Sequence, residues 1–480
     1  MSIVKQRQLL GLVVLGALCI TGCMMPSKLS EPPDLRVPEG FAAMDGKEGR
    51  VISRQLLFTD PALVTLLDTA VRQNPDAYIA LHRIEAARSQ LRIRKGALLP
   101  ALEAAGSASV QRYGDYTMEG VGNFDTNLSG NIDENQKVPL PHVPSYFIGL
   151  RSSWEIDLWG KLRSQKEAAF MRLLGTEQAR NLVITTLVAE VSARYYELQA
   201  LDEELEILKH NLSLQDSAVR IAEVQKEAGR ATQLAIQQFE AQLLRTRSLL
   251  LQTEQRILRT ENELNALLGR FPQPVVRSSR LLQQPLPGEF SAGLPRAILD
   301  RRPDVLQAEL ELRASRADVA AARAAFLPAL SLNPFAGYSA FSGSLLFDPG
   351  SLVYGIAGSA VAPLVNRSAV KGNHSRAEAE RMEAFYRYRK TVLGAFSEVQ
   401  STLNDLEKLR QIDSLNRQET IVLAAAVTTS NELFRVGYAS YLDVITAQRN
   451  ALDAQINQVE TRRNLFVSLI SLYRATGGGW

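Results

Sequence analysis

The sequence predicts a mixed α+β membrane protein built by internal duplication, with two amphipathic strands and two long helices in each half. Three observations predict this fold: matching blocks of residues, short segments that alternate with period two, and long proline-free segments with heptad spacing. The composition is ordinary, and Lys+Arg 54 against Asp+Glu 51 leaves a net charge of +3 over 480 residues. This balance argues against a polyanionic partner such as nucleic acid.

The N-terminus carries targeting information. An apolar run over residues 9–20 is shorter than the ~20 residues needed to span a bilayer. It ends in Ile20-Thr21-Gly22-Cys23, which resembles a bacterial lipobox. We therefore expect a signal peptide over residues 1–22 and a mature N-terminus at Cys23 that carries N-palmitoyl and S-diacylglycerol groups. An ordinary secretory signal with a chance cysteine is the alternative.

The cysteine count agrees with an acylated, exported chain. The only cysteines are Cys19 and Cys23, and Cys19 would leave with the signal peptide. Met24 after the cysteine favours sorting to the outer membrane. Acylation at one residue anchors a protein without threading it through the bilayer. No later segment has 18 consecutive apolar residues, so any further crossing would use strands.

The two halves share one plan. Asn74-Pro75-Asp76 recurs 228 positions later as Arg302-Pro303-Asp304, and the Leu-Pro-Ala-Leu at residues 99–102 recurs at the same offset. Further matches, 208 positions apart, are Gly229 with Gly437, Leu234 with Leu442, and Gly269 with Gly477. Ungapped blocks in the same order indicate duplication of a unit near 200 residues, too long for a solenoid repeat.

The first repeat is predicted over residues 74–270. It begins with an Ala-, Arg- and Leu-rich helix that ends before Pro100. Strands follow at about 102–113 and 146–157, where apolar and polar residues alternate. The stretch between them is rich in Gly, Asn and Asp and is expected to be an exposed connection. A long helical hairpin over 160–268 completes the repeat.

The second repeat is predicted over residues 301–480. Its helix is followed by strands at about 330–340 and 353–363, with more glycine and weaker alternation, and by a helical hairpin over 366–475. The Pro-rich residues 271–300 are expected to link the halves within a belt around the helices. Residues 23–73 are expected to form the acylated N-terminal segment and part of a belt around the helices.

The predicted hairpins show coiled-coil spacing. In the first hairpin, seam positions include Ile236, Leu243, Leu250, Ile257 and Leu264, with Phe239, Thr246, Thr253 and Thr260 between them. Gly229 and Gly437 are placed where a left-handed turn would fold the chain back. Thr232 and Ser440 are predicted N-caps of the returning helices.

Four amphipathic strands cannot close a membrane barrel, because about eight is the practical minimum and open edges would be unpaired in lipid. The strands must therefore join a barrel shared between copies, or lie outside the membrane. Three copies would give twelve strands and twelve long helices, but this argument alone does not fix the number at three.

Beyond these patterns, the chain resembles the outer-membrane factor (TolC-like) family, in its lipoprotein branch of RND-type efflux channels (OprM/CusC/NodT-like). The resemblance covers nearly the whole chain and rests on the order and spacing of short motifs. These motifs include Cys23, Phe58–Leu63, Ser153–Gly160, Arg301–Val305, Ala321–Pro328, Tyr441–Val444 and Gly477–Trp480.

The resemblance implies a homotrimer with a twelve-stranded β-barrel in the outer membrane and a twelve-helix α-barrel in the periplasm. It implies passive export of drugs, toxic small molecules or metal ions. The expected partners are a periplasmic adaptor (membrane fusion) protein and an inner-membrane RND-type transporter, which supply the energy. The adaptor is expected to contact the helical tips near Gly229 and Gly437.

The family's periplasmic end closes at an apolar and an acidic ring. Leu442 matches the apolar position, but the acidic position four residues later holds Thr446, and Asp443 follows Leu442 directly. Three Asp443 carboxylates around a threefold axis would attract cations. The alternative is that Asp443 is a solvated first-turn residue favoured by the helix dipole.

No catalytic or metal-binding pattern stands out. The four histidines, His82, His142, His210 and His374, are scattered without metal-ligand spacing, so we expect no enzyme activity and no cofactor beyond the lipid. Tyr146, Phe147, Trp154 and Trp159 are expected either in an aromatic girdle at the membrane boundary or in the belt.

Two other functions stay open at this point. One is the outer-membrane conduit of a type I secretion system. The other is a lipid-anchored coiled-coil scaffold without a pore, in which the strands form a small sheet outside the membrane.

Overall fold

A computed structural model describes residues 38, 57–277, 280–286, 295–363, 365 and 367–478. The predicted signal peptide, Cys23 and most of the N-terminal segment lie outside the described residues. The chain divides into two compact units. Of the described residues, the first unit, here the strand unit, comprises those within 86–173 and 311–384, and the second, the hairpin unit, comprises residue 38 and those within 57–85, 174–310 and 385–478.

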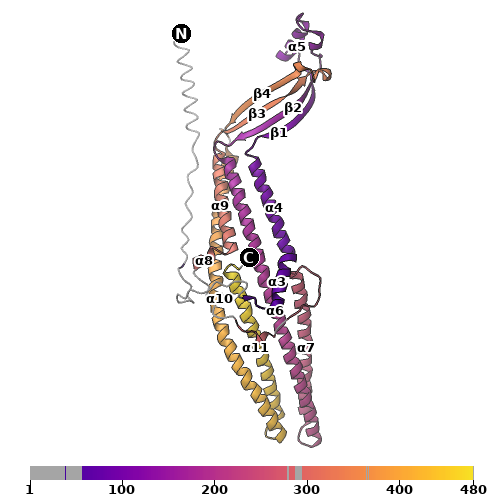
Figure 1. The fold of residues 1–480 in the computed structure, drawn as a ribbon, viewed down its shortest axis with the longest axis vertical. Coiled ribbons are helices and arrows are strands. Elements are labelled where there is room, and N and C mark those ends of the chain that lie inside the picture. The colour runs from indigo at the N-terminus through magenta and orange to yellow at the C-terminus, as the bar shows by residue number, and fades with distance from the viewer. Residues whose placement is uncertain are drawn as a thin grey trace. The chain divides into compact units, whose positions relative to one another are not determined.

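The strand unit contains one antiparallel sheet of four strands in the order β1-β2-β3-β4 (Figure 1). The strands are β1 (Ala101–Gln111), β2 (Val143–Ile156), β3 (Ala329–Ala340) and β4 (Leu352–Val361). Each strand overlaps one of the four predicted segments. The sheet joins the two sequence repeats, because β2 of the first repeat pairs with β3 of the second.

The pairing register gives the sheet two chemically different faces. Arg151 lies opposite both Glu103 and Phe335, and these residues share a face with serines, glycines and alanines. The opposite face is apolar and exposed, and includes Leu102, Val110, Ile148, Leu150, Leu352, Tyr354 and Ile356. The alternation in the sequence therefore corresponds to two sides of one sheet.

The connection between β1 and β2 contains structure that the sequence did not predict. Helix α5 (Met118–Leu128) and the 3₁₀ turn η1 (Glu134–Gln136) lie within it. Thr117 caps α5, since its hydroxyl accepts a hydrogen bond from the Gly120 backbone N–H. The Gly- and Asn-rich composition predicted an exposed connection; the segment is exposed, but it also contains this capped helix.

The four long helices form two hairpins. Helix α6 (Lys161–Glu227) returns as α7 (Gln233–Leu267), and α10 (Ser368–Val436) returns as α11 (Tyr441–Ala475) (Figure 1). The shorter elements are α3 (Pro61–Gln73), α4 (Pro75–Gly96), η2 (Leu281–Gln283), α8 (Pro295–Leu299), α9 (Pro303–Ala324), η3 (Gly343–Leu345) and η4 (Pro349–Ser351). Among the described residues, no helix combines the length and apolarity needed to cross a membrane.

The hairpin turns confirm the predicted glycines and caps. Gly229 and Gly437 have φ angles of 71° and 86°, which a side chain would strain. After each glycine the next N–H bonds back to the carbonyl five residues earlier, from Arg230 to Gln225 and from Tyr438 to Leu433. Thr232 and Ser440 then cap α7 and α11 through their hydroxyls.

The buried seam of α7 includes the threonines of the predicted heptad pattern. Thr246, Thr253 and Thr260 are buried, together with Ile236, Phe239 and Leu264. The Thr253 hydroxyl can be buried because it hydrogen-bonds Glu204 Oε1 at 2.8 Å and the Leu249 carbonyl at 3.0 Å. The seam therefore mixes apolar and hydroxyl side chains, and the Thr253 hydroxyl is satisfied by the partner helix and by the preceding turn.

In both repeats, a side chain just before the first helix of the repeat bonds the end of the returning helix. The Asn74 side chain donates to the Leu267 carbonyl at 2.9 Å, and Arg302 donates to the Ala475 carbonyl at 2.8 Å. Asn74 and Arg302 are equivalent at the 228-residue offset, and Leu267 and Ala475 at the 208-residue offset. Each bond satisfies a carbonyl at the end of the returning helix, where no intrahelical partner exists.

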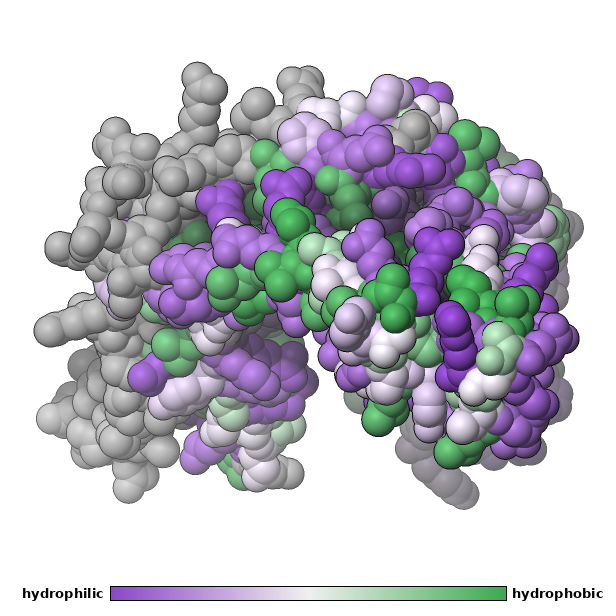
Figure 2. All heavy atoms as spheres, turned by 90° about the horizontal axis from the view of Figure 1, so that it is seen from below, coloured by the Kyte–Doolittle hydropathy of each residue, from purple (hydrophilic) through white to green (hydrophobic). Residues whose placement is uncertain are grey.

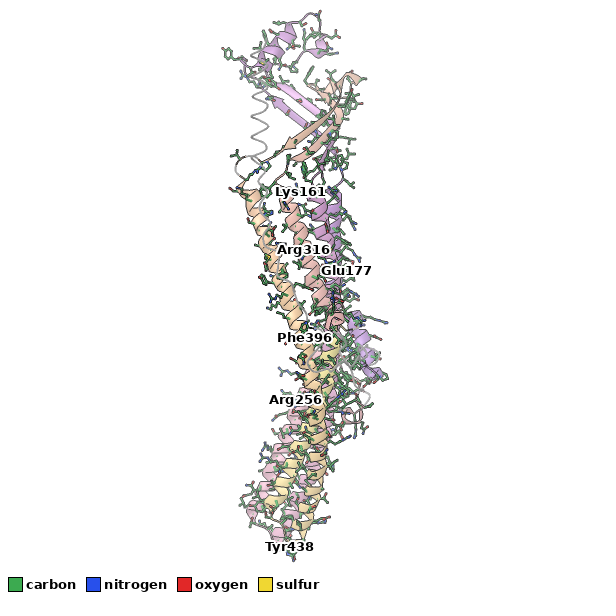
Figure 3. All side chains as sticks on the ribbon, turned by 90° about the vertical axis from the view of Figure 1, so that its left-hand side faces the viewer. Lys161, Glu177, Arg256, Arg316, Phe396 and Tyr438 are labelled. Atoms are coloured by element: carbon green, nitrogen blue, oxygen red, sulfur yellow. The ribbon has the colours of Figure 1, made fainter. Side chains whose placement is uncertain are left out.

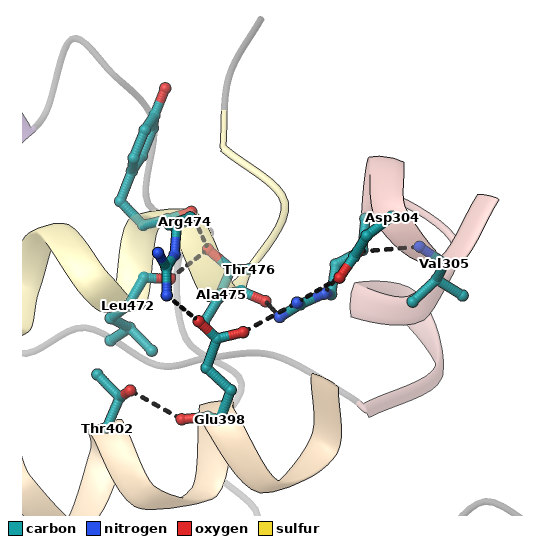
Figure 4. Close-up of polar contacts among 10 residues, drawn as sticks. Asp304, Val305, Glu398, Thr402, Leu472, Arg474, Ala475 and Thr476 are labelled. Atoms are coloured by element: carbon teal, nitrogen blue, oxygen red, sulfur yellow. Dashed lines mark hydrogen bonds and ion pairs between the residues drawn. The ribbon is translucent and has the colours of Figure 1, made fainter. Parts of the chain in front are cut away.

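In the second repeat, the Arg302 contact is part of a charged network. Figure 4 shows Glu398, Asp304 and Ala475 converging from α10, α9 and α11. The buried Arg302 guanidinium bonds Asp304 at 2.7 Å and Glu398 at 2.9 Å, and Arg474 bonds Glu398 at 2.6 Å. Burial alone lowers the pKa of Arg302, but the hydrogen bond and charge of Asp304, with the charge of Glu398, raise it overall. Arg302 is therefore a fixed cation that holds three helices together.

Arg302→Met is expected to destabilise the hairpin unit by about 3 kcal/mol, because it leaves Asp304 and the Ala475 carbonyl without their buried donor. The urea midpoint of helix loss, followed by circular dichroism, measures this effect. Arg296→Met, which removes an exposed arginine in α8, is the matched control and should leave the midpoint unchanged. Equal midpoints for both variants would contradict the role given to Arg302.

Candidate functional site

The sheet is incomplete within one chain. Strand β1 pairs only with β2 and β4 only with β3, so the outer edges of β1 and β4 have no partner among the described residues. Their backbone N–H and C=O groups need another strand or water. In the apolar face, Tyr354 and Ile356 of β4 are 80% and 69% exposed. A sheet of this kind is suited to lipid on one face and further strands at both edges.

The indole side chains anchor the ends of the strands. Trp154 Nε1 donates to the Leu98 carbonyl at 3.1 Å, and Trp159 Nε1 donates to the Pro328 carbonyl at 2.8 Å. Both acceptors lie just before a strand, so these tryptophans hold the segments that lead into β1 and β3. Phe147 departs from the expected grouping with them, because it lies on the polar face of the sheet.

The predicted tip residues lie at the ends of the hairpins. Gly229 and Gly437 have open space around them, where an added Cβ would meet nothing within 4 Å. Tyr438, beside Gly437, is 86% exposed at the end of its hairpin (Figure 3). Viewed from this end, hydrophilic and hydrophobic residues are interspersed rather than gathered into one apolar face (Figure 2). The tips thus present accessible side chains of mixed polarity.

The three predicted gate residues lie together at the start of α11. Leu442, Asp443 and Thr446 are all exposed, and Leu442 and Thr446 share a helix face four residues apart. Asp443 also has a local role, since its carboxylate accepts a hydrogen bond from the Ser440 backbone N–H at 2.8 Å. The Ser440 hydroxyl in turn caps the Asp443 N–H at 3.3 Å. This is a capping box, which the Ser-x-x-Asp sequence would have indicated.

The capping box keeps Asp443 charged. Hydrogen bonds from the Ser440 side chain and backbone lower the pKa of Asp443 below its usual value. The stabilisation from the ionised form is therefore present above the unfolded-state pKa and is lost as the pH falls through the lowered folded-state pKa. At neutral pH an exposed negative charge stands beside Leu442.

The described residues contain no group of three or more His, Cys, Asp or Glu side chains arranged to hold a metal ion. The arrangement they do show is a half-finished sheet with an apolar and a polar face, joined to helical hairpins with accessible ends. These features are typical of a membrane-protein subunit whose sheet is completed by further strands.

Comparison with known proteins gives the family. The model of the outer membrane efflux protein family matches residues 66–270 and 294–478. OpmQ of Pseudomonas putida, a pyoverdine export outer membrane protein, is 29% identical, with 95% of this chain and 97% of OpmQ covered. The cation efflux system protein CusC of Escherichia coli is 28% identical, with 97% of both chains covered. A crystal structure of a membrane protein from Pseudomonas aeruginosa matches with a TM-score of 0.83 at 29% identity, covering 95% of this chain and 98% of that one.

The chain belongs to the outer membrane efflux protein family. It is an outer-membrane channel component of efflux, as the sequence predicted. Its relatives are efflux proteins rather than enzymes, which is consistent with the expectation that this chain catalyses no reaction.

Two variants separate the cap from the gate at Asp443. Ser440→Ala removes the hydroxyl cap and is expected to destabilise the start of α11 by about 1 kcal/mol, while the carboxylate stays. Asp443→Asn keeps a hydrogen-bond acceptor and removes the charge. If the carboxylates form a ring, only Asp443→Asn should lower cation selectivity in reversal-potential measurements. Unchanged selectivity in Asp443→Asn would leave Asp443 with the capping role alone.

Proposed function

We propose that three copies of this chain form the outer-membrane duct of a tripartite efflux system. Each copy contributes four strands to a twelve-stranded barrel and four long helices to a periplasmic α-barrel. The observation that carries the proposal is the sheet with an exposed apolar face and two unpaired edges. In lipid every backbone polar group needs a partner, so such a sheet is stable there only when copies close it.

The number of copies follows from the family resemblance and is compatible with barrel geometry. Two copies would give an eight-stranded barrel, and side chains largely fill the interior of a barrel of that size. Three copies give twelve strands and leave room for a lumen. In this arrangement the polar face of each sheet, with its serines, glycines and Arg151, would line the lumen.

Solutes would pass without chemical change, driven by an inner-membrane RND-type transporter and linked by a periplasmic adaptor. The hairpin ends at Gly229 and Gly437 would meet the adaptor, because they offer exposed side chains such as Tyr438. Leu442, Asp443 and Thr446 would form the constriction at the periplasmic end. Acyl groups at Cys23 would fix each copy to the membrane.

The relatives do not agree on one cargo, since OpmQ is a pyoverdine exporter and CusC a cation exporter at nearly equal identity. We propose drugs, toxic small molecules or metal ions as the cargo class. Export rates of a panel of drugs, toxic small molecules and metal ions, measured in cells with and without this chain, would show which of these classes is transported. A type I secretion conduit would export a protein and leave small-molecule tolerance unchanged.

A pair of neighbouring lysine substitutions tests membrane insertion. Ile356→Lys places a charge on the apolar face of β4, where lipid contact would cost about 2–4 kcal/mol near the bilayer centre. Ala357→Lys places the same charge on the polar face. We expect Ile356→Lys to reduce the yield of heat-resistant oligomer in the outer membrane, while Ala357→Lys assembles and conducts in planar bilayers with altered ion selectivity.

If the chain is a pore-free scaffold, a different result is expected for Ile356→Lys and Ala357→Lys. Its sheet would lie in water, so both lysines would be tolerated equally and neither protein would pass current. Equal yields without conductance would therefore overturn the channel proposal.

Cys23→Ser tests the lipid anchor. We expect the variant to lose incorporated palmitate and the mass of the acyl groups, while oligomers that still assemble keep their conductance, because the residue lies far along the chain from the strands. Intact-mass spectrometry and labelled palmitate measure the first effect. Acylation that persists in the variant would contradict the assignment of Cys23.

A further inference from the structure

The polar face of the sheet carries two large apolar side chains, Phe147 on β2 and Phe335 on β3. Their rings meet edge to face, with centroids 6.4 Å apart and planes at 69°. The Arg151 guanidinium lies over the Phe147 ring, 4.6 Å from its centroid. Arg151 and Phe335 are direct cross-strand partners, so the three side chains form one cluster on two adjacent strands.

Glycines hold this cluster down on the sheet. A Cβ at Gly355 would lie 2.7 Å from Phe335 Cε1, and a Cβ at Gly149 would lie 3.0 Å from Phe147 Cζ and 2.5 Å from the Ala336 carbonyl oxygen. Each ring therefore occupies the space that a side chain on the neighbouring position would fill. The aromatic surfaces are held by rigid strands rather than by a loop, which favours precise binding.

A cavity of about 730 Å³ lies over this part of the sheet. It is lined by Phe147, Arg151 and Phe335, together with Glu103, Asn333 and Ala357 among others. Small-molecule sites typically have volumes of about 300–1,000 Å³ and combine apolar surface with a few polar groups. Phe335 is 39% exposed, so part of its ring is available to a solute.

The charge in the cavity points to an anion. Among the described residues Arg151 has no ion-pair partner, and one face of its guanidinium is covered by Phe147. Its N–H donors can therefore bind a carboxylate or sulfonate in bidentate fashion. Glu103 lies directly across from Arg151 on β1 but is not paired with it, so its carboxylate weakens the attraction for an anion.

We infer that this cluster, here called the phenyl–guanidinium site, binds aromatic solutes that carry a single anionic group. The ring of the solute stacks against Phe147 and Phe335, and its carboxylate or sulfonate bonds Arg151. The inference rests on the proposed channel, because it places the site in the lumen, where a transported solute would meet it. Binding there would be weak and reversible, as a conduit requires.

Single-channel current in a planar bilayer tests the site, with 2-naphthalenesulfonate as the probe. Wild-type channels are expected to show brief, concentration-dependent blocks. 2-Naphthylmethylammonium lacks the anion and should block at least about tenfold more weakly, the factor that corresponds to losing one charge-assisted hydrogen bond. Methanesulfonate lacks the ring and should block between about twofold and tenfold more weakly, the factor that corresponds to losing one stacked ring.

Four variants define the residues. Arg151→Gln should weaken the block about tenfold or more, and Phe335→Leu between about twofold and tenfold. Glu103→Gln removes the opposing charge and should strengthen the block by about twofold to fivefold. Arg112→Gln removes an arginine outside the cavity lining and should leave the block unchanged.

The outcomes separate the site from the channel. Absence of current without probe would refute the proposed function itself. Normal current with a block that Arg151→Gln and Phe335→Leu do not change, or with equal block by methanesulfonate, would overturn the site and keep the channel. Loss of oligomer heat resistance in Phe335→Leu with an unchanged block would show that the rings only cover the glycines.

Discussion

Among the described residues the outer edges of β1 and β4 have no strand partner, and this is the constraint on which the rest of the structure depends. A four-stranded sheet leaves two edges open, and its exposed leucine, isoleucine and tyrosine side chains make water a poor solvent for one face. Both needs are met together when copies of the chain join edge to edge in a bilayer. The polar face would then be an interior surface. Its small side chains would leave space there, and its charged and aromatic residues would face that space.

The two repeats make equivalent contacts at the ends of their returning helices. Asn74 and Arg302 are chemically different, yet both donate to the carbonyl that ends the returning helix of their repeat. Gly269 and Gly477 stand at the same closure, where a Cβ would lie 2.3 Å from the Gln73 carbonyl oxygen and 3.0 Å from that of Arg301. The equivalent positions of the two repeats therefore make the same contact with a helix-end carbonyl. The donor is an amide in the first repeat and part of a charged network in the second.

Much of the fold could be predicted from the sequence because its signals are periodic and local. Alternation predicts β2 and heptads predict the hairpins, while Gly229 and Gly437 mark the turns because only glycine tolerates their positive φ without strain. Helix α5 was missed because glycine and asparagine dominate its segment, although Thr117 caps it. The seam threonines were predicted as seam positions, but their burial depends on partners such as Glu204, which lies 49 residues away in sequence.

The candidate sites were less accessible to sequence reasoning. From the sequence, Asp443 is either a gate residue or a solvated first-turn residue, and the hydrogen bonds to Ser440 add a capping role that the Ser-x-x-Asp spacing would have indicated. Phe147 was grouped with the tryptophans as an aromatic residue, whereas alternation along β2 places it on the face opposite Tyr146. The cluster of Phe147, Arg151 and Phe335 joins the two repeats across β2 and β3, so no local pattern could have predicted it.

The most direct test of the account is whether β1 of one copy lies beside β4 of another. The predicted mature chain has Cys23 as its sole cysteine, acylated, so a cysteine placed at Ala105 and a second scanned along residues 353–359 would be the only free thiols. If β1 and β4 pair between copies, an oxidant at some position links each copy to two neighbours and yields a covalent trimer after denaturation. A stable monomer in detergent, with no cross-link at any position and no sheet protected from exchange, would contradict it.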